Sequence, residues 1–286
     1  MVKGYYILIL LFLAMGCSKD YVETDPFTGE EVQFLSTNPS ASCQLTRLRQ
    51  ISGKTSFNRL DYQRDNANKL LGMDYYDSIT NTVDYKLSFQ YRGDTIGMGT
   101  TEWMVQDSIS KNITQYFVRD TSNGSYWDDI LYVYKYDLAG KLTKKLTYYN
   151  YSVDPDYITN YLYDGNDLVT TQLLAGDGQS KLMQTDVVYD ASTSIKPWIY
   201  LFGDAFENYR HLQGFSFGKR PTHTVKKIVS TIYDVNNGAT LDVWTTNFGG
   251  YVISKDQYVL QATSTGDIQQ GMGLLLGTIR FDYQCK

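Results

Sequence analysis

The sequence predicts an all-β fold: an antiparallel meander of long hairpins that forms a curved sheet or an open barrel or sandwich, with one short helix near residues 198–211. The first observation behind this prediction is composition, because the chain has 26 Tyr, 12 Phe and 4 Trp residues. Aromatic side chains favour the pleated, half-buried surface of a sheet. The second is a repeated hairpin unit that does not alternate with helical segments, which favours antiparallel over parallel pairing.

The hairpin unit joins an alternating aromatic strand to an Asp-led turn and a second apolar strand. Its clearest copies are Tyr134–Leu142 (YKYDLAGKL) and Tyr161–Leu168 (YLYDGNDL), with weaker copies around Tyr62, Tyr91, Tyr189 and Tyr233. Tyr at i and i+2 faces one side of a strand, while Asp bonds its own backbone and Gly or Asn accepts a positive φ. Tyr136, Tyr163 and Tyr189 follow one another at 27 and 26 residues, about one long hairpin each.

The hairpin rhythm is interrupted between Ile195 and Pro221. Apolar residues with helical spacing follow Pro197, a residue that favours a helix start. They are Trp198, Phe202, Ala205, Phe206 and Tyr209. We expect a short helix packed on the sheet, with this stripe as part of the core; the lining of a ligand cleft is the alternative.

The first 16 residues are predicted to be a signal peptide. Lys3 precedes an apolar run at 5–15, which is far shorter than the roughly 20 residues that a spanning helix needs. Gly16-Cys17 followed by polar residues resembles the lipobox of bacterial lipoproteins, although Ala14 stands where that pattern prefers Leu. The resemblance implies lipidation of Cys17. Ordinary signal cleavage, for which Ala14 and Gly16 also suffice, is the alternative.

The mature chain is expected to comprise a lipidated N-terminus and flexible tether at 17–42 and a single β-rich domain at 43–286. Lipidation of Cys17 leaves Cys43 and Cys285 as an even pair near the two ends of that domain. Domain termini often lie close together, and the envelope outside the inner membrane is oxidising. We therefore predict a Cys43–Cys285 disulfide; two unpaired buried thiols are the alternative.

The sequence contains no catalytic, cofactor-binding or metal-binding motif. The only histidines, His211 and His223, lack zinc-site spacing, and we interpret them as surface or turn residues. The segment 164–167 has the oxygen-rich composition of a calcium loop but lacks its alternating ligands, and we interpret it as a turn. A glycan hydrolase would need two facing carboxylates, for which the candidates are Asp128, Asp129, Glu102 and Glu207.

Charge argues against one class of partner. Removing residues 1–16 takes one lysine from a chain of net charge −5 and leaves −6. Nucleic-acid binders carry a basic face, so we expect no nucleic-acid partner.

Three short motifs resemble the Asp-Ser/Thr-aliphatic acceptor of O-glycosylation in exported proteins of gut anaerobes. They are centred on Ser78, Thr95 and Ser108. The resemblance implies that these three hydroxyls carry glycans.

The hairpin unit also resembles the YD-repeat of bacterial surface proteins, and the whole chain is similar to β-rich lipoproteins of gram-negative gut anaerobes. The resemblance implies an envelope location, at the outer membrane on its periplasmic or outer side, and supplies no catalytic residue. We expect a non-enzymatic, monomeric binding or scaffold module that is attached to the membrane by lipid and binds a glycan or an envelope protein. A hydrophobic-ligand carrier or lipoprotein chaperone, and a glycan hydrolase, are the alternatives.

Overall fold

The computed structural model of the 286-residue chain describes residues 23–24, 31–32, 43–52, 59–66, 69–77, 80–99, 101–120, 128–196, 215–267 and 277–285. Within these ranges every regular element is a β-strand, and no helix is long and apolar enough to cross a membrane. The strands are β1 (Glu23–Thr24), β2 (Glu31–Val32), β3 (Cys43–Ser52), β4 (Arg59–Arg64), β5 (Leu70–Tyr76), β6 (Val83–Arg92), β7 (Thr95–Met98), β8 (Glu102–Gln106), β9 (Ile113–Asp120), β10 (Asp128–Tyr136), β11 (Leu142–Tyr149), β12 (Tyr157–Asp164), β13 (Asp167–Ala175), β14 (Lys181–Ser194), β15 (His223–Tyr233), β16 (Thr240–Ile253), β17 (Val259–Gly266) and β18 (Gly277–Cys285).

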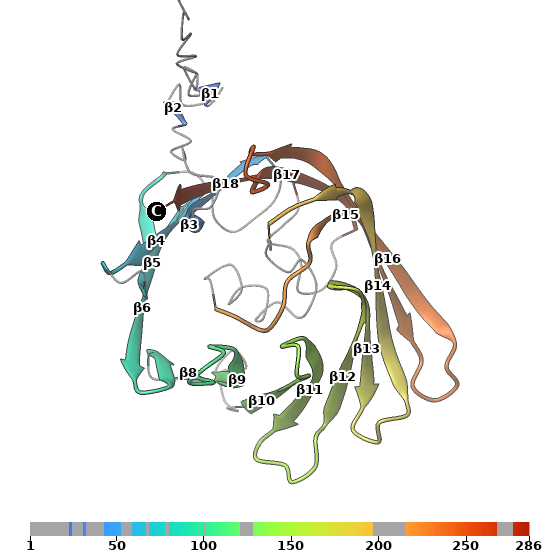
Figure 1. Ribbon diagram of the computed structural model, residues 1–286. Helices are drawn as coiled ribbons and strands as arrows, with labels where there is room; N and C mark the ends of the chain where they lie inside the picture. Colours follow the sequence, from blue (N-terminus) through green and yellow to red (C-terminus); the bar gives the residue numbers. More distant parts are fainter. Residues whose placement is uncertain are drawn as a thin grey trace, which may run out of the picture.

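Strands β3 to β18 form one closed antiparallel barrel in which each strand pairs with its neighbours in the chain (Figure 1). The barrel closes where β18 pairs with β3, with Cys43 opposite Cys285. The all-β meander predicted from the sequence is confirmed, but the barrel is closed rather than open. Closure satisfies the backbone groups that the first and last strands would otherwise expose as sheet edges.

The antiparallel meander divides the turns between two rims. The terminal rim holds the two ends of the barrel chain, Cys43 and Cys285, together with the turns that follow the even-numbered strands β4 to β16. The far rim holds the turns that follow the odd-numbered strands. Residues that are distant in sequence therefore meet at one rim whenever their turns leave strands of the same direction.

The repeated tyrosines lie at the terminal rim, and the predicted hairpin spacing is confirmed. Tyr136, Tyr163 and Tyr189 lie on β10, β12 and β14, and each directly follows a break in register, which re-aims its side chain. Four rim tyrosines donate their hydroxyl to a carbonyl near the start of the preceding strand: Tyr91 to Leu70 (2.8 Å), Tyr136 to Ile113 (2.5 Å), Tyr189 to Leu168 (2.9 Å) and Tyr251 to Val225 (2.7 Å). The motif thus joins adjacent strands at their ends.

The inner face of the wall is the hydrophobic core. Buried apolar side chains from almost every strand form one cluster, and its largest fully buried members include Tyr116, Phe217, Phe281, Leu48, Leu60, Met73, Ile96 and Met104. On β13 to β15 the inner face also carries a row of buried hydroxyls, Thr171, Thr185 and Ser230, which lie opposite one another in register. Thr185 and Ser230 share a hydrogen bond of 2.8 Å.

Two predictions concern segments outside the barrel wall. The helix predicted near 198–211 lies outside the described residues. Within the predicted tether, β1 pairs with β2 over two residue pairs, a short ladder that the sequence did not predict.

Candidate functional site

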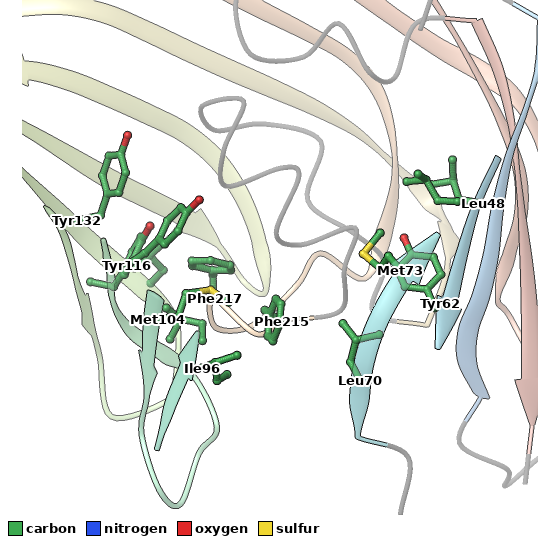
Figure 2. Packing of buried hydrophobic residues seen from close by; sticks show 14 of the residues in the cluster. Leu48, Tyr62, Leu70, Met73, Ile96, Met104, Tyr116, Tyr132, Phe215 and Phe217 are labelled. Atoms are coloured by element: carbon green, nitrogen blue, oxygen red, sulfur yellow. The ribbon is translucent and has the colours of Figure 1, made fainter. Parts of the chain in front are cut away.

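The described part of the connection between β14 and β15 lies inside the barrel. Residues 215–222, which we call the strap, run within the ring of strands as the orange segment that leads into β15 (Figure 1). Phe215 and Phe217 lie along one stretch of the wall, between Ile96 and Met104 of β7 and β8 on one side and Leu70 of β5 on the other (Figure 2). Both rings are buried, so the strap fills part of the space that the strands enclose.

The strap is bound to three turns of the terminal rim. Ser216 donates its hydroxyl to the side chain of Asn112, in the turn after β8, at 2.7 Å. The carbonyl of Ser216 accepts from the amide of Ile113, also at 2.7 Å. The amide of Lys219 donates to the carbonyl of Gly140 in the turn after β10 (3.0 Å). Because the strap joins turns that are separate in sequence, it braces this side of the rim.

The third contact of the strap is with Asp167, at the start of β13. The amide of Thr222 donates to one Asp167 carboxylate oxygen at 2.9 Å, and Nδ1 of His223 lies 2.5 Å from the other. His223 was interpreted as a surface or turn residue, and it is a half-buried strand residue with a carboxylate partner. Among the described residues no group of three or more His, Cys, Asp or Glu side chains could hold a metal ion.

Gly218 allows the strap to lie against the wall. Its φ of +100° is one that side chains disfavour. A Cβ atom there would lie 2.9 Å from the carbonyl oxygen of Gly140 and 3.0 Å from the Tyr136 ring. Only glycine fits this approach without displacing the turn after β10.

One part of the outer wall, formed by β18 and β3 to β6, is charged. Its residues alternate with the buried side chains of the same strands, as in the pattern of β4, where Leu60 and Tyr62 are buried between less buried neighbours. They form four ion pairs: Arg47–Asp61 (2.6 Å), Arg59–Asp61 (3.3 Å), Arg49–Asp282 (3.4 Å) and Lys86–Asp74 (3.9 Å). We call this region the charged arc.

A second part of the outer wall, on β8 to β12, is apolar. Register places Trp103, Phe117, Leu131 and Tyr148 side by side on four successive strands. The rings of Trp103 and Phe117 stack with centroids 5.3 Å apart. Val105, Val133, Leu146, Ile158 and Leu162 lie on the same outer face. We call this region the apolar arc.

Two of the four carboxylates considered for hydrolysis, Asp129 and Glu102, are engaged in hydrogen bonds. Asp129 accepts two hydrogen bonds from Arg119 (2.7 and 3.1 Å) and one from the Tyr151 hydroxyl. The hydrogen bonds from Arg119 and then from Tyr151 lower the pKa of Asp129, which disfavours a role as general acid. Glu102 accepts from the Tyr116 hydroxyl at 2.8 Å, Asp128 is the first residue of β10, and Glu207 lies outside the described residues.

The cysteine prediction agrees with the register of the closing strands. Cys43 is disulfide-bonded, and Cys285 is its direct partner in the β18–β3 ladder. That these two thiols are joined to each other stays a prediction. Cys17, the predicted lipidation site, lies outside the described residues.

Of the three hydroxyls predicted to carry glycans, two lie in the described chain. Ser108 is exposed in the turn after β8, whereas Thr95 is a half-buried residue of β7. Ser78 lies outside the described residues. Glycosylation of all three stays a prediction.

Two solved structures from Bacteroides share this fold. A porin-like protein from Bacteroides vulgatus ATCC 8482 is 15% identical, with a TM-score of 0.55, and the match covers 84% of this chain and 98% of that chain. A porin-like protein from Bacteroides uniformis ATCC 8492 is 10% identical, with a TM-score of 0.54, covering 85% and 96%. The chain therefore has a porin-like barrel fold. No protein-family model and no curated protein sequence matches it.

Sequence reasoning missed the strap and the two arcs. The strap begins within the interrupted stretch at 195–221, which contains Gly203, Gly214 and Gly218, and nothing local distinguishes Gly218 from the other two. The arcs follow from which strands are neighbours, and Arg49 and Asp282 are 233 residues apart in sequence. Neither arc corresponds to a short sequence motif.

Proposed function

We propose that this protein is a non-enzymatic module of the bacterial envelope, attached by lipid on Cys17, and that its barrel stands on the membrane instead of spanning it. The observation that carries this proposal is the polarity of the wall. Porins face lipid with an apolar band and enclose water. Here the buried face is the apolar inner one, and the charged arc places Arg47, Asp61 and Asp74 in the middle of outward-facing strand surfaces.

The shortest strands support the same conclusion. A strand that crosses a bilayer needs about 9 to 11 residues. β4 has 6 residues, β7 has 4 and β8 has 5. These strands are too short to cross a hydrocarbon core of about 30 Å.

The role as a binding or scaffold module rests on two supports. The predicted signal peptide and lipobox-like Cys17 favour an envelope location, and the fold is that of porin-like proteins from Bacteroides. Among the described residues, the candidate catalytic carboxylates Glu102 and Asp129 serve structural hydrogen bonds. A glycan or an envelope protein is the proposed partner, with the apolar arc as a surface for it.

Fractionation of cells that produce the wild-type and Cys17→Ser proteins tests this proposal. We expect wild type in the membrane fraction and Cys17→Ser in the periplasmic extract, monodisperse without detergent. Ser36→Ala, in the same tether, is the control that should behave as wild type. A Cys17→Ser protein that needs detergent, or that forms conducting channels in planar bilayers, would show a spanning barrel. Wild-type protein in the soluble fraction would refute only the lipidation of Cys17.

A hydrophobic-ligand carrier is the second candidate, and the inner face favours it. The interior combines the apolar cluster with the hydroxyl row Thr171, Thr185 and Ser230 and with buried Lys145. Such a lining suits an amphipathic ligand. Native mass spectrometry of protein purified from its own host discriminates, because a carrier retains a small molecule that organic solvent extracts, and a scaffold does not.

A further inference from the structure

Two neighbouring turns of the terminal rim each expose an apolar side chain to solvent. Ile109, in the turn after β8, is 90% exposed, and Leu138, in the turn after β10, is fully exposed. Isolated exposed apolar residues are common on protein surfaces. Here two stand at the tips of adjacent turns.

Both turns are rigid. The Asp107 carboxylate accepts from the amides of Ile109 (3.1 Å) and Ser110 (2.7 Å). The Asp137 carboxylate accepts from the amide of Lys141 at 2.8 Å. These bonds fix each tip before any partner arrives, so binding costs little conformational entropy.

The strap holds the two turns next to each other. Ser216 bonds Asn112 in the first turn, and Lys219 bonds Gly140 in the second. A Cβ atom on Gly140 would lie 4.0 Å from the side-chain nitrogen of Asn112, so the turns touch. Ile109 and Leu138 are therefore presented as one surface.

This surface is surrounded by lysines. Lys111, Lys135, Lys144 and Lys219 are exposed, and Lys141 lies at the end of the second turn. Within the two turns Lys111 and Lys141 balance Asp107 and Asp137, and Lys135, Lys144 and Lys219 add three positive charges beside them. Lys135 and Lys144 lie directly opposite each other, a placement that disfavours folding through like-charge repulsion. The mature chain as a whole has a charge of −6.

The chain enters the barrel on this same rim. β3 begins at Cys43, and the 26 residues before it, 17–42, lead back to Cys17. A flexible chain of this length would reach roughly 25 to 30 Å. A lipid on Cys17 therefore brings the membrane to the rim that carries Ile109, Leu138 and the lysines.

We propose that the terminal rim docks on the anionic phospholipid surface of the membrane that holds the lipid anchor, with Ile109 and Leu138 inserted at the interface and the lysines among the head groups. Apolar side chains flanked by Lys suit this boundary, and anionic lipids attract basic segments within a Debye length. The inference rests on the proposed function. The docking fixes the orientation of the barrel, with its far rim away from the lipid.

The far rim supplies a matched comparison. Val153, in the turn after β11, is 94% exposed, but it lies beside Asp154 and Asp156 instead of lysines. An apolar side chain of similar exposure is thus flanked by carboxylates, which repel anionic lipid.

Vesicle flotation with the unlipidated Cys17→Ser protein tests the docking. At low salt we expect flotation with vesicles that contain about one third phosphatidylglycerol and none with pure phosphatidylcholine. Ile109→Ser with Leu138→Ser, or Lys135→Glu with Lys144→Glu, should weaken binding at least about tenfold. Val153→Ser should leave it unchanged, and circular dichroism verifies the fold of each variant.

Two results would overturn the docking: no flotation of Cys17→Ser protein with anionic vesicles, or an equal loss in Val153→Ser. Either result leaves the fractionation of the wild-type lipoprotein unaffected, so the docking fails separately from the lipid anchor. A glycan located on Ser108 of the native protein by peptide mass spectrometry would also overturn it, because that glycan would cover the tip beside Ile109.

Discussion

The inner and outer faces of the same strands differ, and this difference is the ground for the proposal that the barrel does not span the membrane. On β6 the buried Phe89 is followed by the exposed Gln90, and Phe89 contacts Phe215 of the strap with ring centroids 5.1 Å apart. The period of two in a strand gives each face its own composition. A porin-like fold is therefore compatible with either lipid or water around its outer wall. Which of the two surrounds it depends on which set of side chains faces inward.

The largest expected effect comes from placing a charge on each face in turn. Phe89→Asp should cost more than about 4 kcal/mol of unfolding free energy, because it buries an unpaired carboxylate in the apolar cluster. Gln90→Asp should change it by less than about 0.5 kcal/mol. Urea unfolding of both variants measures the difference. The reverse order would indicate a water-filled lumen and a lipid-facing wall.

The seam between β18 and β3 closes the barrel, and the disulfide predicted there should have the next largest effect. Cys43→Ser together with Cys285→Ser is expected to cost about 2 to 5 kcal/mol, because the bond closes nearly the whole barrel chain into one loop. Thiol counting on the unreduced protein should give no free thiols. Two free thiols would show that the cysteines are not joined.

The strap should tolerate little change where it touches the wall. Gly218→Ala is expected to cost about 1 to 3 kcal/mol, because alanine meets both an unfavourable φ and the Gly140 carbonyl. Gly97→Ala is the matched control: its Cβ would have 3.8 Å of clearance. Thermal unfolding compares the two, and equal stability would show that the strap can shift.

The smallest effect appears only at alkaline pH, through the tyrosines of the inner face. Burial raises the pKa of Tyr91 to about 12 and that of Tyr62 well above its usual value. Such groups stabilise the fold below their unfolded pKa of about 10, and this contribution is lost as pH rises toward the folded value. Unfolding free energy should therefore fall above about pH 10. A flat profile up to pH 12 would contradict the burial of these rings.

The sequence predicted the strands better than their assembly. The Tyr-x-Tyr-Asp unit fixes local alternation and turns, and both Tyr136 and Tyr163 lie where the hairpin spacing requires. Closure depends on the pairing of β18 with β3, strands from the two ends of the barrel chain, which no local pattern encodes. Alternation also does not state which face turns inward, because an aromatic stripe suits a core and a lipid boundary equally well.

The surface formed by Ile109 and Leu138 could not be predicted from the sequence for a similar reason. Ile109 and Leu138 are 29 residues apart in sequence and meet only because two hairpins leave the barrel on the same rim. In the sequence each was one apolar residue in a polar turn. Their shared surface exists through the strap contacts of Ser216 and Lys219.

Depth-dependent quenching tests the central claim, that the barrel stands on the membrane, most directly. If Cys43 and Cys285 are joined and Cys17 is lipidated, one introduced cysteine is the only thiol that a fluorophore can label. The positions are Leu138 at the terminal rim, Ser88 on the charged arc and Leu162 on the apolar arc, in lipoprotein reconstituted with lipids that carry a quencher. We predict quenching at Leu138 alone. Quenching of Ser88 and Leu162 by quenchers deep in the acyl chains would show a spanning barrel and contradict the account.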